Sequence, residues 1–209
     1  MKHIVLLGDS TLDNAAYVEG GPDVVRQLRA ILPRDWRATL NAVDGTVIAG
    51  IGAQLQRVPA DAGQLVVSVG GNDALLAAGV LDERARSVAE ALDKLAAVRE
   101  RFHHDYRAML DLVASRGLTT AVCTIYEARF PEADRRRIAA TALTLINDCI
   151  TREAFSRGLP LIDLRLICDS DDDFANPIEP SRHGGAKIAG AIAQFVVGAN
   201  TPVSPVIAR

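Results

Sequence analysis

The chain opens with Met1-Lys-His-Ile-Val-Leu-Leu-Gly-Asp-Ser10, and this stretch decides the fold that we expect. Residues 4–7 form a short apolar run, which is typical of a strand buried on both faces at the centre of a parallel sheet. Gly8 interrupts the run, and a glycine allows the chain to turn where the strand ends. We therefore expect Ser10 at the carboxyl edge of the sheet, where open α/β sheets bind their ligands.

Length and composition are those of an ordinary globular protein. The chain has 209 residues, of which 49% are hydrophobic and 23% are charged, so one core of good size is expected and residues 1–209 are predicted to form a single domain. The formal net charge is −3 and the sequence pI is about 5.8. Because the basic residues do not gather into a run, we expect no nucleic-acid partner.

The sequence also bears on location. No apolar stretch is long enough to cross a bilayer, and the first apolar run is too short for the hydrophobic region of a signal peptide. The three cysteines, Cys123, Cys149 and Cys168, are odd in number and widely spaced, which favours small core residues in a reducing compartment over disulfides or a metal site. We therefore expect a cytoplasmic protein without a membrane partner, whose oligomeric state the sequence does not predict.

Strand-like and helical patterns alternate along the whole chain. This alternation predicts an α/β protein with a parallel sheet and right-handed crossovers. A buried first strand favours the flavodoxin-like strand order 2-1-3-4-5, with helices on both faces of the sheet in three layers. Strands are expected at residues 4–7, 37–43, 64–69, 118–125 and 159–164. Helices are expected at residues 23–32, 46–58, 81–116 (as one helix or as two joined by a bend around Phe102) and 135–157. A last helix includes 188–197 and begins near Pro180, before an extended tail.

Residues suited to acyl transfer follow each of the first three strands. Ser10 follows the first strand, Gly45 the second and Asn72 the third. The carboxyl ends of parallel strands share one edge of the sheet, so these residues are expected to meet. A serine offers a nucleophilic hydroxyl, a glycine leaves its backbone N–H accessible, and an asparagine amide is a neutral donor for a negative oxygen.

These blocks, in this order, resemble those of the SGNH (GDSL-type) serine hydrolases. The family has a Ser in a Gly-Asp-Ser block, a Gly, an Asn in a Gly-x-Asn-Asp block and a His near the C-terminus. Gly70-Gly71-Asn72-Asp73 fits the third block fully, whereas Thr11 departs from the Gly-Asp-Ser-Leu form of the first. The resemblance implies that Ser10 is the nucleophile and that Gly45 and Asn72 donate to the oxyanion.

The fourth block departs from the family pattern, which reads Asp-x-x-His-Pro. In the family a Gly follows five residues after this His. Aligning Pro180 and Gly184 with the family's Pro and Gly puts Glu179 where the family has its catalytic His, and Asn176 where it has Asp. The nearest histidine is His183, four residues later than the pattern requires.

Two interpretations of this departure stay open, and we favour the first. If Pro180 begins the last helix, Glu179 and His183 stand one turn apart, so the carboxylate orients a histidine that acts as the general base. In the second interpretation Glu179 itself faces Ser10 and His183 is a surface residue. A solvated carboxylate is a weak base for a serine hydroxyl, so this version implies slow chemistry or a changed role.

The resemblance implies a serine esterase that works through an acyl-enzyme on Ser10, with a small-molecule ester as substrate and with neither cofactor nor metal. Because no lid or large apolar insertion is visible, small acyl groups are expected. An acyltransferase or thioesterase on the same site is one alternative, and a weakly catalytic ligand-binding protein that has lost its histidine is another. A flavin-binding protein is disfavoured, because the loop after the first strand lacks a Ser/Thr-rich phosphate cradle.

Overall fold

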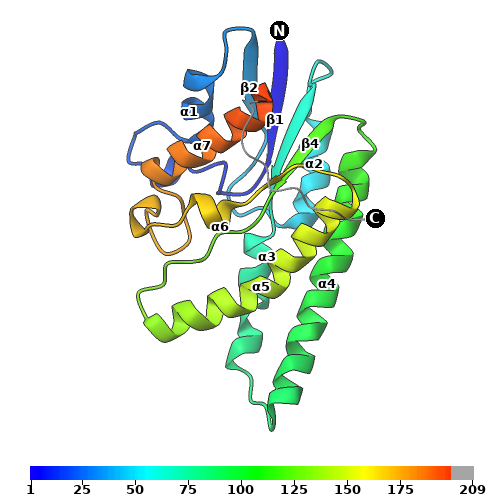
Figure 1. Cartoon of the computed structure of the whole chain (residues 1–209), viewed down its shortest axis with the longest axis vertical. Coiled ribbons are helices and arrows are strands. Elements are labelled where there is room, and N and C mark those ends of the chain that lie inside the picture. Colours follow the sequence, from blue (N-terminus) through cyan, green and yellow to red (C-terminus); the bar gives the residue numbers. More distant parts are fainter. Residues whose placement is uncertain (199–209) are drawn as a thin grey trace.

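A five-stranded parallel sheet forms the centre of the computed structural model, which describes residues 1–198 (Figure 1). The strand order is β2-β1-β3-β4-β5, and every neighbouring pair is parallel. This confirms the predicted α/β fold and the predicted strand order. The strands are β1 (Lys2–Gly8), β2 (Trp36–Leu40), β3 (Gln64–Ser68), β4 (Thr119–Cys123) and β5 (Leu161–Ile162).

Helices cover both faces of the sheet, as predicted. Helices α1, α6 and α7 lie on one face, and α2, α4 and α5 lie on the other. Among residues 1–198 no helix is both long enough and apolar enough to cross a membrane. The α-helices are α1 (Val24–Ile31), α2 (Ile51–Gln56), α3 (Gly71–Ala77), α4 (Val88–Ala114), α5 (Ala133–Ser156), α6 (Leu164–Ile167) and α7 (Arg182–Val197). Short 3₁₀ helices are η1 (Ala15–Tyr17), η2 (Ile48–Gly50), η3 (Ala78–Asp82) and η4 (Asp171–Asp173).

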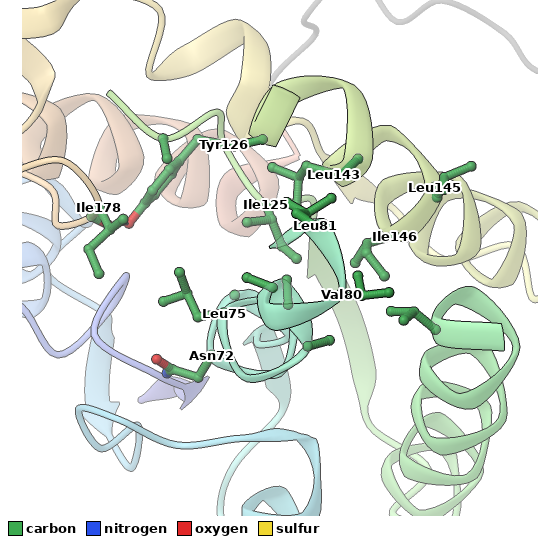
Figure 2. Close-up of a pocket in the computed structure, with 18 of the residues that line it drawn as sticks. Asn72, Leu75, Val80, Leu81, Ile125, Tyr126, Leu143, Leu145, Ile146 and Ile178 are labelled. Atoms are coloured by element: carbon green, nitrogen blue, oxygen red, sulfur yellow. Dashed lines mark hydrogen bonds between the residues drawn. The ribbon is translucent and has the colours of Figure 1, made fainter. Parts of the chain in front are cut away.

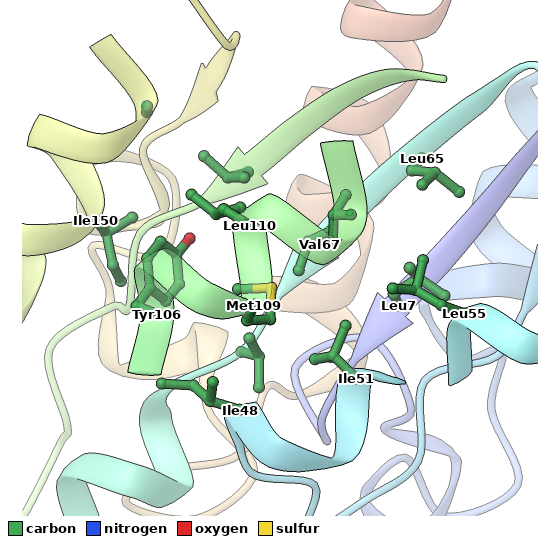
Figure 3. Close-up of a cluster of buried hydrophobic side chains, with 14 of the residues drawn as sticks. Leu7, Ile48, Ile51, Leu55, Leu65, Val67, Tyr106, Met109, Leu110 and Ile150 are labelled. Carbon is green, nitrogen blue, oxygen red and sulfur yellow. The ribbon is translucent and has the colours of Figure 1, made fainter. Parts of the chain in front are cut away.

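The apolar run of β1 contributes to both faces because successive strand side chains alternate. Ile4 and Leu6 pack in the cluster with α1 and α7, whereas Val5 and Leu7 pack in the cluster with α2, α4 and α5. Figure 3 shows the second cluster, where Leu7 lies near Ile51 of α2. All four β1 side chains are fully buried, which explains why this strand has no polar alternation.

Several predicted elements are shorter than their sequence patterns. The helix expected at 46–58 is η2 followed by α2, and the strand expected at 159–164 is the two-residue β5, because Asp163 accepts a hydrogen bond from the Arg165 N–H and begins α6. The helix expected at 81–116 is α4, which begins at Val88 because Ser87 caps it by accepting from Glu90 N–H. Helix α3, directly after β3, was not predicted.

The last helix begins two residues later than expected. Ser181 is its N-cap, and its hydroxyl accepts from the backbone N–H groups of His183 and Gly184. Pro180 lies outside the helix and pairs with Phe174 in an isolated antiparallel bridge. The helix ends at Val197, and Gly198 caps it in the left-handed conformation, with φ 59°. The extended tail predicted after it lies outside the described residues.

Gly8 ends β1 against the backbone of β3. Its φ is +142°, and a Cβ built there would lie 1.8 Å from the carbonyl oxygen of Ser68, which is its register partner. No side chain fits that space, and an L-residue rarely adopts that φ. Only glycine therefore lets the two strand ends stay this close.

We predict that Gly8→Ala lowers the free energy of unfolding by about 3 kcal/mol or more, because the backbone of β1 or β3 must move. Gly190→Ala in α7 is the matched control, since a Cβ there meets nothing within 4 Å. It should raise the free energy of unfolding by about 1 kcal/mol through helix propensity. Urea unfolding of both variants tests this, and equal effects would contradict the clash at Gly8.

Candidate active site

Ser10 lies just beyond the carboxyl end of β1. The Asp9 N–H donates to the Ser68 carbonyl at 3.1 Å, which continues the pairing of β1 with β3 by one residue. The N–H groups of Leu12 and Asp13 then donate back to the Asp9 carbonyl at 3.1 and 3.0 Å, so the chain turns sharply at Ser10. Ser10 is 7% exposed. The turn presents its hydroxyl to a cavity instead of to bulk solvent.

Asn72 lies in the first turn of α3, directly after β3. Its Nδ2 donates to the Thr46 carbonyl at 3.0 Å, and the neighbouring Asp73 carboxylate accepts from the Ile48 N–H at 3.0 Å. These two bonds attach the start of α3 to the segment that contains Gly45. One hydrogen of the Asn72 amide is used by Thr46, which leaves the other for a substrate oxygen.

Gly45 lies in the turn after β2 and is exposed. Its φ is +76°, and the turn is closed by a 3.1 Å hydrogen bond from the Thr46 N–H to the Val43 carbonyl. Gly45 does not line the cavity beside Ser10, although its neighbour Thr46 binds Asn72. The fold thus brings all three predicted strand ends to one edge of the sheet.

Gln54 is a buried polar residue that sequence reasoning missed. Its Oε1 accepts from the Gly8 N–H at 2.7 Å, and its Nε2 donates to the Gly8 carbonyl at 2.8 Å and to the Thr46 hydroxyl at 3.2 Å. This one side chain, 2% exposed, therefore ties the end of β1 to the turn after β2. A glutamine among the apolar positions of α2 was the signal in the sequence.

Glu179 lines the same cavity as Ser10 and is 7% exposed. Its Oε2 is buried and accepts no hydrogen bond from residues 1–198. Burial raises the pKa of this carboxyl above its ordinary value, a hydrogen bond with Ser10 opposes that shift, and the charge of Asp44 adds to it. Glu179 is thus a desolvated carboxylate beside the serine, and not the solvated one that the sequence suggested.

The loop that carries Glu179 is fixed at several points. The Glu179 N–H donates to Asn176 Oδ1 at 3.0 Å, and the Glu179 carbonyl accepts from the Ala175 N–H at 2.9 Å. The Pro180 carbonyl then accepts from Asn14 Nδ2 at 3.1 Å. Asn14 belongs to the segment after Ser10, so this bond holds that segment and the Glu179 loop together at the site.

His183 does not line the cavity. Its side chain is 64% exposed, and its Nε2 lies 3.7 Å from an Asp173 carboxylate oxygen. Asp173 is fully buried and also binds the Lys187 ammonium at 2.8 Å. The pairing of His183 with Glu179 that we expected across one helical turn does not occur, because Glu179 precedes the N-cap and lies outside the helix.

Asp9 is a second buried carboxyl at the cavity. Burial raises its pKa to about 7, although hydrogen bonds from the backbone and side chain of Thr11 oppose the shift, and the charges of Glu179 and Asp73 add to it. The Thr11 N–H donates to Asp9 Oδ1 at 3.0 Å. The Asp9 carboxyl group therefore stabilises the loop around Ser10. Because it is buried, it ionises only near neutral pH.

The cavity beside Ser10 has a volume of about 620 Å³ and an apolar lining. Its walls come from α3, η3, α4 and α5 and from the segments after β4 and before α7. Figure 2 shows Leu75, Tyr126 and Ile178 around the end nearest Asn72, and Leu143 and Ile146 of α5 farther along. This volume is within the range of small-molecule sites.

Comparison with known proteins identifies the family. The model of the GDSL-like lipase/acylhydrolase family matches residues 6–186, which include the end of β1, the start of α3 and the beginning of α7. The chain belongs to this family. Membership of this family supports a hydrolase. A comparison with curated protein sequences returned no match.

Solved structures of other GDSL-like proteins and esterases share the fold. An acetyl xylan esterase aligns with TM-score 0.70 and 16% identity over 93% of this chain and 99% of its own. An extracellular lipase from Streptomyces rimosus aligns with TM-score 0.66 and 17% identity over 92% of this chain and 98% of its own. A lipase/acylhydrolase from Enterococcus faecalis aligns with TM-score 0.65 and 20% identity over 98% of this chain and 100% of its own. At these identities the likeness shows the fold alone.

We predict that Asp9→Asn reduces the pH dependence of stability. The folded-state pKa of about 7 lies above the ordinary value of 3.8, so folded Asp9 holds a proton that the unfolded chain releases, and raising the pH from 4 to 8 lowers the free energy of unfolding. Asp9 accounts for a decrease of the order of 4 kcal/mol in the free energy of unfolding over this pH range, and this decrease should be absent in Asp9→Asn. Urea unfolding at both pH values measures the difference; parallel pH dependence in wild type and variant would be inconsistent with a buried, protonated Asp9.

Proposed function

We propose that this GDSL-like protein is a serine hydrolase of carboxylic esters in which Ser10 is the nucleophile and Glu179 is the general base. The observation that carries the proposal is the buried Glu179 carboxylate, which lines one apolar cavity together with Ser10. Desolvation raises the pKa of this carboxyl, and a carboxylate with a raised pKa is a stronger base than the solvated group that the sequence suggested.

The reaction follows from these positions. The Ser10 hydroxyl gives its proton to Glu179 as its oxygen bonds to the ester carbon. Glu179 returns that proton to the alcohol as the ester C–O bond breaks, which leaves an acyl group on Ser10. Water then gives a proton to Glu179 and attacks the acyl carbon, and the proton returns to Ser10 as the acid leaves.

Amide donors stabilise the negative oxygen in this mechanism. We assign this role to the Ser10 and Gly45 N–H groups and to the free hydrogen of the Asn72 amide. The bond from Asn72 to Thr46 supports the assignment, because it holds the amide in one orientation beside the Gly45 turn. One such donor is commonly worth about 3 kcal/mol of transition-state stabilisation.

The apolar cavity receives the acyl group in this proposal. Its volume of about 620 Å³ exceeds what an acetyl group fills, so acyl chains longer than the small groups expected from the sequence are accommodated. Each additional buried CH₂ group contributes about 0.8 kcal/mol to binding. The cytoplasmic location stays a prediction from the sequence.

The roles of the three side chains are tested by substitution. With a chromogenic octanoate ester, Ser10→Ala and Glu179→Gln should each lower kcat by at least about 10³-fold, because each removes a group that reacts. His183→Ala should stay within about twofold of wild type, since this side chain is exposed and outside the cavity. Loss of activity in His183→Ala with full activity in Glu179→Gln would reverse the choice of base.

Product analysis in the same assay distinguishes the neighbouring functions. Ester formation with an added alcohol, in preference to release of free acid, would make the protein an acyltransferase. A wild-type protein that neither hydrolyses the ester nor reacts with a fluorophosphonate at Ser10 would be a binding protein. Labelling of wild type but not of Ser10→Ala is the result expected for a serine hydrolase.

The pH profile tests the base directly. Glu179 must be ionised to accept a proton, so kcat/KM should rise with pH along one limb whose midpoint lies above the ordinary carboxyl value of 4.5. Glu179→His, which restores the residue of the family pattern, should keep activity and move that limb toward about 6.5, the ordinary pKa of histidine. An unmoved limb would show that another group, such as Asp9, sets the profile.

A further inference from the structure

Two aspartates lie in turns at the same edge of the sheet as Ser10, outside the lining of the apolar cavity. Asp44 and Asp13 lie in the turns that follow β2 and β1, and the Asp44 N–H donates to Asp13 Oδ2 at 3.0 Å. The Tyr17 hydroxyl donates to Asp44 Oδ2 at 2.8 Å. Neither aspartate lines the cavity. The site is therefore apolar on one side of Ser10 and acidic on the other.

Glu179 connects the two sides. It lines the cavity, and its charge also acts on Tyr17, whose pKa the hydrogen bond to Asp44, burial and the charge of Glu179 together raise to about 12. The charged neighbours that shift the pKa values of Glu179 and Asp9 are all carboxylates, and each raises the value. None of the charged groups that shift the pKa values of Glu179, Asp9 and Tyr17 is a cation.

The unpaired Oε2 of Glu179 points to a ligand. A carboxylate oxygen that is buried and accepts no hydrogen bond is costly, and such an atom is ordinarily paired. Ser10 donates only one hydrogen, so the other carboxylate oxygen is available to a positive group. Among residues 1–198 no three His, Cys, Asp or Glu side chains form a group that could hold a metal ion, which favours an organic cation.

We propose that the ester substrate carries a positive charge on its alcohol part, which binds between Glu179 and Asp44 while an apolar acyl chain fills the cavity. This rests on the proposed ester hydrolysis and names the substrate class for it. The cation attracts the substrate to the acidic side and fixes which end of the ester enters the cavity. The leaving amino alcohol then departs toward solvent past Asp44, which is exposed.

Two esters of equal shape test the charge alone. Octanoylcholine has a quaternary nitrogen where 3,3-dimethylbutyl octanoate has a carbon, and their acyl chains are identical. We expect kcat/KM of the wild type to be at least about tenfold higher for the choline ester, and 0.5 M salt to reduce this ratio by screening. Asp44→Asn should lower the ratio at least about threefold while keeping a partner for the Tyr17 hydroxyl.

Asp35→Asn is the matched control. It removes the same charge at the opposite edge of the sheet, where the Asp35 carbonyl binds the start of β1, and its side chain is 62% exposed. The ratio should not change in this variant. Equal decreases of this ratio in Asp35→Asn and Asp44→Asn would show that net charge alone causes the effect, and would overturn the proposal.

A binding measurement separates this inference from the proposed function. Octyltrimethylammonium, which cannot be hydrolysed, should bind the wild type and bind Glu179→Gln at least about tenfold more weakly in calorimetry. Hydrolysis of both esters at equal kcat/KM would overturn the inference and leave the hydrolase intact. Binding of the cation without hydrolysis of either ester would support the cation site between Glu179 and Asp44 but overturn both the hydrolase and the ester substrate class. Absence of binding and of hydrolysis would overturn the cation site as well.

Discussion

The close contact of the β1 and β3 backbones at Gly8 is the constraint on which the site depends. Because no side chain intervenes, Asp9 still pairs with Ser68, and Ser10 follows at a fixed distance from the start of α3. Gln54 binds both backbone groups of Gly8 and extends this constraint to the turn after β2. Three segments that are distant in sequence thereby share one rigid edge, as preorganised donors require.

Burial of carboxyl groups is the main electrostatic cost at this edge. Asp9 and Glu179 are both less than one-tenth exposed and raise one another's energy when ionised. Backbone and hydroxyl donors from Thr11 offset part of the cost at Asp9, whereas Oε2 of Glu179 has no such compensation within residues 1–198. Strained or unsatisfied groups of this kind are characteristic of functional sites, where a substrate completes the interactions.

The cavity depends on a region that packs little against the sheet. Helix α3, η3 and the first turns of α4 extend away from the strands together with the N-terminal part of α5 (Figure 1). Their apolar side chains face one another across an open space instead of closing it. The polar groups lie at one end, where α3 begins at Asn72, so a ligand has one orientation that satisfies both ends.

The sequence by itself determined the parallel sheet, its strand order and the positions of Ser10 and Asn72 after buried strands, because these follow from local periodicity and from glycines at strand ends. Only the tertiary structure decided that Glu179, and not His183, lies beside Ser10. The difference arises because Ser181 caps α7 and leaves Glu179 in the preceding loop, where contacts with Asn14 and other distant residues hold it. Burial is likewise a property of the whole fold, so no local pattern could show that this carboxylate loses its water.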